Sequence, residues 1–218
     1  NQLSLDTTGH NITNAGTEGY SRQSVNLAAT RGQQVSSIYG QVMVGTGVDS
    51  TSIERARNVY ADKQYWSETA QQQYYKTQQT NYDKVEAIFN DSGNTGIKNA
   101  VTEFYNAWND LSTSASTASN RTAVIEKGNV LADRIKTASQ QLQAQINAQY
   151  DDMRLSVTQI NDYTDQLVKL NQNIMTTEAT GARANDLRDQ RDLIVDNLSK
   201  YMNLNVYEDE KGMYSVVS

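Results

Sequence analysis

One stretch of this sequence constrains the fold more than any other, because residues 124–174 keep a nearly uninterrupted helical spacing of apolar side chains. Its members are Val124, Leu131, Ile135, Ala138, Leu142, Ile146, Met153, Val157, Ile160, Leu167, Leu170 and Ile174. At about 1.5 Å per residue, such a helix would be on the order of 75 Å long. This exceeds the width of an ordinary globular domain, so the stretch predicts an elongated helical protein.

The composition favours the same architecture. The chain has no proline, which would remove a backbone donor and clash with the preceding helical turn. Only 37% of the residues are hydrophobic, and the mean hydropathy is -0.69. This suits helices that each bury one narrow stripe and leave the rest in water. We therefore predict a mainly α fold, an elongated bundle of long antiparallel helices.

The ends of the chain have a different pattern from the middle. Residues 1–13 predict a helical remnant, and residues 20–50 alternate as extended, hairpin-like structure. Residues 203–207 and 213–217 alternate again, around a charged turn. The sequence thus predicts three parts: 1–50, a helix remnant with an extended hairpin; 51–202, an elongated helical domain; and 203–218, the start of a β domain.

Within the helical domain, Thr51–Glu54 has the spacing of a capping box, so we expect the first long helix to begin there and to run to about Asn90. Residues 91–96 should break it. A second helix should follow over residues 97–111, and Gly181 should end or interrupt the longest one. The aromatic side chains, among them Trp66 and Trp108, lie mostly on helix stripes, where packing in the core is the expected role.

Charge and hydropathy exclude several classes of partner. Nineteen basic residues against 25 acidic ones give a formal net charge of -6, so no basic patch is expected for nucleic acid. No run approaches the roughly 18 apolar residues of a membrane span, and no cleaved signal peptide opens the chain. We predict neither a nucleic-acid nor a membrane partner.

No residue pattern predicts catalysis. The single histidine, His10, has Ser4, Asp6 and Ser21 near it in sequence, but no nucleophile motif accompanies them, so we interpret it as a solvated or capping histidine. The acidic turn 208–212 lacks the ligand spacing of a calcium loop. Cysteine is absent, which excludes disulfides and thiolate metal sites. We predict no catalytic, cofactor-binding or metal-binding residue, and no enzyme.

Residues 185–192 carry charges of alternating sign on a short predicted helix. Arg188 and Asp192 are four residues apart, so they could pair on its surface, where such a pair contributes only a few tenths of a kcal/mol. The residues alone favour a solvated face, although a buried network and a contact to a neighbouring subunit both remain open for Arg188, Asp189 and Arg191.

Residues 11–23, NITNAGTEGYSRQ, form a polar corner between the first helix and the first strand. They resemble a signature of the axial proteins of the bacterial flagellum, approximately N-I-A-N-A-N-T-P-G-Y-x-R-Q. Gly16 replaces the usual Asn, and should preserve a left-handed turn. Glu18 replaces the usual Pro, and loses its fixed φ.

A second stretch, 185–199, is similar to the N-D-L-x-D-Q-R-D-x-L segment of the FlgK-type hook-associated family, and the resemblance covers essentially the whole chain in order. Residues 47–55 match as well. Rod and hook proteins lack this helix. The positions that carry the family signature are Asp186, Leu187, Asp189, Gln190, Arg191, Asp192 and Leu198.

The resemblance implies a structural, non-enzymatic protein without a cofactor. Members are exported unfolded through the flagellar type III channel, helped by an export chaperone, and form an extracellular ring between hook and filament. The implied partners are other copies of the chain, the hook protein and the second hook–filament junction protein. Candidate residues for the axial turn and for subunit contacts are Asn11, Asn14, Gly16, Gly19, Tyr20 and Arg22.

The resemblance also implies that the sequence is cut at both ends, since it begins at Asn1 without Met and lacks the family's C-terminal return helices. We then expect residues 1–13 to be poorly ordered or held by a non-native contact, and the chain to be monomeric at micromolar concentration. Two alternatives remain: another flagellar axial protein, such as the second junction protein or a flagellin-like protein, and a secreted binding module or hydrolase on a missing outer domain.

Overall fold

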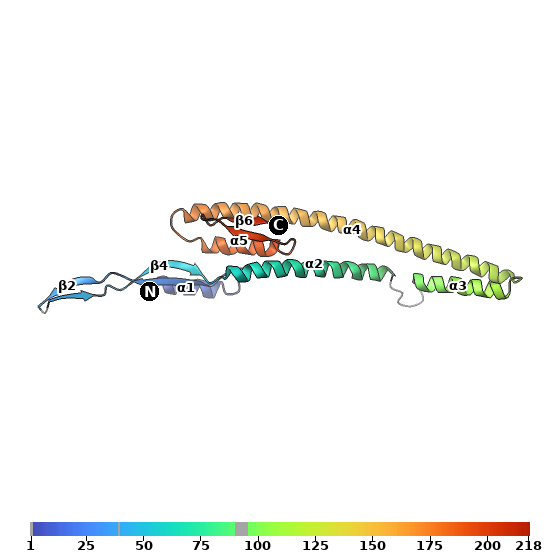
Figure 1. The fold of residues 1–218 in the computed structure, drawn as a ribbon, viewed down its shortest axis with the longest axis horizontal. Coiled ribbons are helices and arrows are strands. Elements are labelled where there is room, and N and C mark those ends of the chain that lie inside the picture. The colour runs from blue at the N-terminus through green and yellow to red at the C-terminus, as the bar shows by residue number, and fades with distance from the viewer. Residues whose placement is uncertain (1, 39, 90–95) are drawn as a thin grey trace. The chain divides into compact units, whose positions relative to one another are not determined.

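The computed structural model describes residues 2–38, 40–89 and 96–218, and it confirms a mainly α fold with strand pairs near both ends (Figure 1). The helices are α1 (Gln2–Thr13), α2 (Val59–Phe89), α3 (Ile97–Thr113), α4 (Ala118–Glu178) and α5 (Asn185–Leu198). The strands are β1 (Gln23–Ala29), β2 (Gln33–Ser37), β3 (Gly40–Val44), β4 (Val48–Arg55), β5 (Asn205–Glu208) and β6 (Tyr214–Val217).

The strands form three antiparallel pairs, β1–β4, β2–β3 and β5–β6. The hairpin-like segment predicted for residues 20–50 and the two strands predicted after residue 203 are thereby confirmed. The chain divides into two compact units: unit 1 holds residues 1–73 and 159–218, and unit 2 holds residues 74–158.

The predicted start of the first long helix is wrong. Residues 51–54 belong to β4, where Ile53 pairs with Val25 of β1. The Nδ2 atom of Asn185 also donates to the Ile53 carbonyl at 3.1 Å, which holds this segment as a strand against α5. The helix begins at Val59 instead, and the cap is Asn58, whose Oδ1 atom accepts hydrogen bonds from the second and third helical N–H groups at 3.0 and 3.4 Å.

The core of unit 1 lies where α2, α4, α5 and the β5–β6 pair meet. Its buried apolar members are Trp66, Leu167, Val195, Leu198, Leu204 and Val206. The indole Nε1 of Trp66 donates to Asp196 Oδ1 at 2.6 Å, so this large side chain is both packed and satisfied. The core therefore joins α5 to α2 and α4, which precede it in the chain.

Unit 2 buries small side chains. Ala100 and Ala107 of α3 and Ala138 of α4 are its buried hydrophobic residues among those described. Gly128 lies against the Phe104 ring, because a Cβ atom placed there would come within 3.3 Å of Phe104 Cε2. The absence of a side chain at Gly128 of α4 thus makes room for the Phe104 ring of α3.

The expectation that the aromatic side chains pack in the core holds for Trp66 and is wrong for several others. The buried hydrophobic side chains of unit 2 are alanines, and none of its described aromatic residues is buried. The exposed aromatic residues of α2 and α3 include Tyr60, Tyr75, Tyr82, Phe89 and Trp108.

One of the two predicted breaks between helices can be followed. The longest helix ends at Glu178, and Gly181 adopts φ +89°, as expected of a helix-terminating glycine. The break predicted over residues 91–96 lies outside the described residues, apart from Gly96. Residues 2–13 form α1, and their order in solution stays a prediction. None of the described helices is both long and apolar enough to cross a bilayer.

Candidate functional site

Four of the charged residues of α5 are buried, which overturns the expectation of a solvated face. Arg191 and Asp192 have exposed fractions of 0% and 1%, and Arg188 and Asp189 are nearly as inaccessible. A buried charge is tolerated only where partners replace the water that it loses. The partners come from segments before and after α5 in the chain. We call these four residues and their partners the α5 network.

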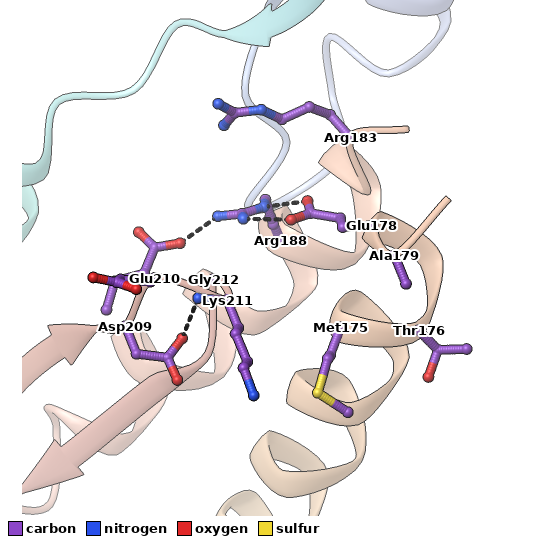
Figure 2. Close-up of a pocket in the computed structure, with 11 residues that line it drawn as sticks. Met175, Thr176, Glu178, Ala179, Arg183, Arg188, Asp209, Glu210, Lys211 and Gly212 are labelled. Atoms are coloured by element: carbon purple, nitrogen blue, oxygen red, sulfur yellow. Dashed lines mark hydrogen bonds and ion pairs between the residues drawn. The ribbon is translucent and has the colours of Figure 1, made fainter. Parts of the chain in front are cut away.

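Arg188 does not pair with Asp192 but with two glutamates that lie ten and twenty residues away. Its Nε and Nη2 atoms donate to both carboxylate oxygens of Glu178, each at 2.7 Å, and its Nη1 atom donates to Glu208 Oε1 (Figure 2). The bidentate contact holds the pKa of Glu178 at about 2, well below its usual value. Arg188 thus ties the end of α4 to β5 across α5.

Arg191 is enclosed by the turn between β5 and β6. Its Nη1 atom donates to the carbonyl of Gly212, and its guanidinium lies 3.4 Å from the centroid of the Tyr214 ring. Burial lowers the pKa of Arg191 and raises the pKa of Tyr214 to about 12. Asn171 of α4 closes the arrangement, because its side chain bonds both the N–H and the carbonyl of Tyr214, at 3.0 and 2.9 Å.

The two aspartates of α5 meet an arginine from β4. The Nη1 atom of Arg55 donates to Asp189 Oδ1 and to Asp192 Oδ2, both at 2.7 Å. Asp192 also lies 3.2 Å from the Nε atom of Arg57. Burial acts to lower the pKa of Arg57, but the charges of Asp192 and Asp62 outweigh it and raise that pKa. Arg55 at the end of β4 and Arg57 just after it therefore offset the negative charges of Asp189 and Asp192.

The polar corner has its own internal clamp. Asn11 at the end of α1 accepts the N–H of Gln23 through Oδ1 and donates through Nδ2 to the carbonyl of Gln23, both at 2.8 Å. The Tyr20 hydroxyl donates to the same Oδ1 at 2.8 Å and lies 3.0 Å from His10 Nδ1. His10 is half-buried in this cluster. One amide thus fixes the first residue of β1 against the last turns of α1.

The corner contacts α5 through one backbone N–H and one side chain of its own. The N–H of Ser21 donates to Asp189 Oδ2 at 3.0 Å, and Gln23 Nε2 donates to Asp186 Oδ1 at 2.9 Å. Each contact links residues more than 160 positions apart in the chain. The two stretches that carry the resemblance therefore meet in one site, with Asp189 between the corner and Arg55.

The corner turns through one glycine. Gly19 has φ +80°, and a Cβ atom there would lie 3.0 Å from Leu193 Cβ, so both its conformation and its close approach to α5 require glycine. The left-handed role expected of Gly16 is wrong, because its φ is not positive and open space surrounds it. Asn14 is not left-handed either; its Nδ2 atom instead donates to the carbonyl of His10 at 3.0 Å.

The other predicted residues divide between the core and the surface. Leu198 lies in the core of unit 1 and Leu187 is half-buried, whereas Gln190 and Arg22 are exposed. Sequence reasoning assigned no role to several partners of the α5 network, namely Arg57, Asn171, Glu178, Glu208 and Tyr214. Arg55 could have been found, because it lies within the family-like stretch 47–55.

A groove of about 940 Å³ lies beside the Arg188–Glu178 pair, and Figure 2 shows its lining side chains. Its lining includes Arg183 and, from the turn between β5 and β6, Asp209, Glu210 and Lys211, so its walls carry both signs of charge. Within the described ranges there is no cluster of three or more residues suited to hold a metal ion. The α5 network can fix one segment against another, which is a structural role.

Comparisons with known proteins agree with this organisation. A family model described as the flagellar hook-associated protein FlgK helical domain matches residues 82–218. The flagellar hook-associated protein 1 of Bacillus subtilis is 32% identical over 225 residues, which cover 100% of this chain and 43% of that protein. The protein of the same name from Escherichia coli is 27% identical over 99% of this chain and 39% of its own length.

A solved structure is also similar. The flagellar hook junction protein FlgK from Burkholderia pseudomallei superposes with a TM-score of 0.61 and 29% sequence identity, covering 71% of this chain and 27% of that one. The chain spans about two fifths of the length of the curated relatives it matches. The family model matches residues 82–218, and both signature stretches meet in the α5 network. This chain therefore belongs to the FlgK family of flagellar hook-associated proteins.

Proposed function

We propose that this chain is a structural, non-enzymatic part of the junction between the flagellar hook and the filament. The observation that carries the proposal is the contact of Asp189 with both the Ser21 N–H and Arg55, which fixes the corner of the family signature to α5. A rigid corner suits a protein that must present its axial segment to neighbours in one orientation. In this role the chain works in the extracellular flagellum after type III export.

The proposed partners are other copies of the chain in a ring, the hook protein, the second junction protein and an export chaperone. Arg22 is exposed at the corner, and Tyr20 is partly exposed although its hydroxyl is bonded to Asn11, so both can contact a neighbouring subunit. By contrast, Asn11, Asn14 and Gly19 are occupied in shaping the corner itself. We therefore assign subunit contact to Arg22 and Tyr20, and positioning to the other three.

Electron microscopy of appendages from cells that lack the full-length protein tests this function. We expect hooks without filaments, with filament subunit shed into the medium. Restoring the gene with Asp189→Ala should rescue filaments poorly, whereas Asp165→Ala, on an exposed position of α4, should rescue them fully. Normal filaments on the deleted cells would refute the proposed function.

A further inference from the structure

His10 is the single histidine of the sequence, and it lies where α1, the corner and α5 meet. Its Nδ1 atom is 3.0 Å from the Tyr20 hydroxyl, and its Nε2 atom is 3.7 Å from Asp186 Oδ2. The rings of His10 and Tyr20 pack edge to face, with their centroids 5.5 Å apart. The two nitrogens of this imidazole therefore face different polar groups, one in the corner and one on α5.

The hydrogen bonds around Tyr20 determine which nitrogen of His10 carries a proton. Asn11 Oδ1 accepts the Gln23 N–H while Nδ2 of the same amide donates to the Gln23 carbonyl, so the orientation of this amide is fixed. The 2.8 Å contact between Tyr20 Oη and Asn11 Oδ1 must then use the hydroxyl proton. Because a hydroxyl has one proton only, Tyr20 accepts at its contact with His10, and Nδ1 is the donor.

This assignment decides what Nε2 can do. With its proton on Nδ1, the neutral ring has a lone pair on Nε2, the atom that faces the Asp186 carboxylate. Two acceptors that face each other form no hydrogen bond. A second proton makes Nε2 a donor and gives the ring a positive charge, so the same contact becomes an ion pair. All the contacts of His10 are therefore satisfied in its protonated state.

The other ionisable groups around His10 are mostly carboxylates. The corner and α5 contribute groups that line the same pocket of about 210 Å³ as the imidazole, namely Glu18, Tyr20, Asp186 and Asp189. Asp189 is already engaged within the α5 network. On α1 itself, Asp6 precedes His10 by four residues. Asp186 is the carboxylate that pairs with the ring.

We propose that His10 is a proton-dependent latch between the corner and α5. When neutral, His10 holds Tyr20 through Nδ1 alone. When protonated, it also pairs through Nε2 with Asp186, whose other oxygen accepts Gln23 Nε2 of the corner at 2.9 Å. Because histidine gains its charge between about pH 8 and pH 5, the latch closes as the surrounding solution becomes more acidic. It is a property of the chain itself and goes beyond the proposed function.

The proton position can be measured directly, because the single histidine gives one pair of ring signals in a ¹⁵N NMR spectrum. At about pH 8.5, where a histidine side chain is ordinarily neutral, we expect Nδ1 to carry the proton and Nε2 to carry none. Tyr20→Phe keeps the aromatic ring but removes the acceptor, so this preference should be lost. A proton on Nε2 in the parent chain, or an unchanged tautomer in Tyr20→Phe, would overturn the proposal.

The latch is tested at the Ser21 amide, whose N–H donates to Asp189 and so reports on the contact between the corner and α5. We measure its hydrogen-exchange protection, corrected for the intrinsic pH dependence of exchange. Between about pH 8 and pH 5.5, the protection should rise about two- to fivefold, the effect of a partly exposed ion pair. Because the purified chain is used, the result is independent of whether cells need the protein for filaments.

Two variants identify the partner of His10. Asp186→Asn keeps an oxygen that accepts Gln23 Nε2 but removes the negative charge, so the rise in protection should disappear. Asp6→Asn removes a carboxylate from the helix of His10 itself and should leave the rise unchanged. Protection that does not vary with pH in the parent chain, or a rise that survives in Asp186→Asn, would overturn the latch. Loss of the rise in Asp6→Asn would also overturn it, by showing that His10 pairs within α1.

Discussion

Arg55 donates a hydrogen bond from Nη1 to Asp189 Oδ1 at 2.7 Å, across 134 positions of sequence. Both side chains are nearly buried, and the other Asp189 oxygen accepts the backbone N–H of Ser21. The pair therefore ties the end of β4, the corner and α5 together, and it is the contact on which the structural account depends.

Removing the charge of Asp189 should destabilise unit 1. We expect Asp189→Asn to lower the free energy of unfolding by about 2 kcal/mol, because Arg55 loses one of its two carboxylates in a buried setting. Urea unfolding followed by the fluorescence of Trp66, in a Trp108→Phe background, reports on this unit alone. Asp165→Asn, at an exposed position, should stay within about 0.5 kcal/mol of the parent; an equal effect of the two changes would contradict the assignment.

Acid should weaken the contact between α4 and α5 through Glu178. Its folded-state pKa is held at about 2 by Arg188, below its ordinary value of 4.5, so its stabilisation is complete above about pH 4.5 and is lost as pH falls toward 2. At neutral pH, Glu178→Gln should cost about 1.5 kcal/mol, and this difference should shrink through that window. Urea unfolding at a series of pH values measures it.

The matched control for Glu178 is Glu210→Gln, at an exposed glutamate that lines the same groove. Its unfolding free energy should follow that of the parent at every pH. A pH-independent deficit in Glu178→Gln would show that packing, and not the charge on this carboxylate, stabilises the contact.

Gly19 and Gly16 provide a comparison within the corner. Gly19→Ala places a Cβ atom at positive φ and within 3.0 Å of Leu193, so it should destabilise unit 1 by more than about 1 kcal/mol. Gly16→Ala meets no atom within 4 Å and should be neutral or slightly stabilising. Thermal unfolding of the two variants checks the prediction, and a reversed order would remove Gly19 from its proposed role.

The clamp made by Asn11 can be tested at the amide that it protects. Asn11→Ala removes the acceptor of the Gln23 N–H, so hydrogen exchange at that amide should accelerate while most of β1 remains protected. Asn26→Ala, at an exposed residue of the same strand, should leave the Gln23 amide unchanged. Unaltered exchange in Asn11→Ala would mean that the clamp does not hold in solution.

The sequence predicted the elements of this fold well, because their signals are local. Apolar spacing located the long helices, alternation located the strands on either side of them, and Gly181 marked the end of α4. The start of α2 was missed because the capping-box spacing of residues 51–54 competes with pairing to β1 and with the bond from Asn185 to Ile53, neither of which is visible locally.

The site was harder to predict for the same reason. Alternating charges on a short helix suggest an exposed surface when only positions four residues apart are considered. The partners that bury them, Arg55, Glu178 and Glu208, lie 10 to 137 positions away and meet α5 only after the chain has folded. The family resemblance singled out Asp189 and Arg191, but not what these side chains contact.

A double-mutant cycle on Arg55 and Asp189 tests the central claim most directly. Unfolding free energies of Arg55→Ala, Asp189→Ala and the double variant give the coupling between the two side chains, free of their separate contributions. We predict a coupling of about 2 kcal/mol, in the range found for contacting residues. A coupling below about 0.5 kcal/mol, the level of independent sites, would contradict the claim that this pair fixes the corner to α5.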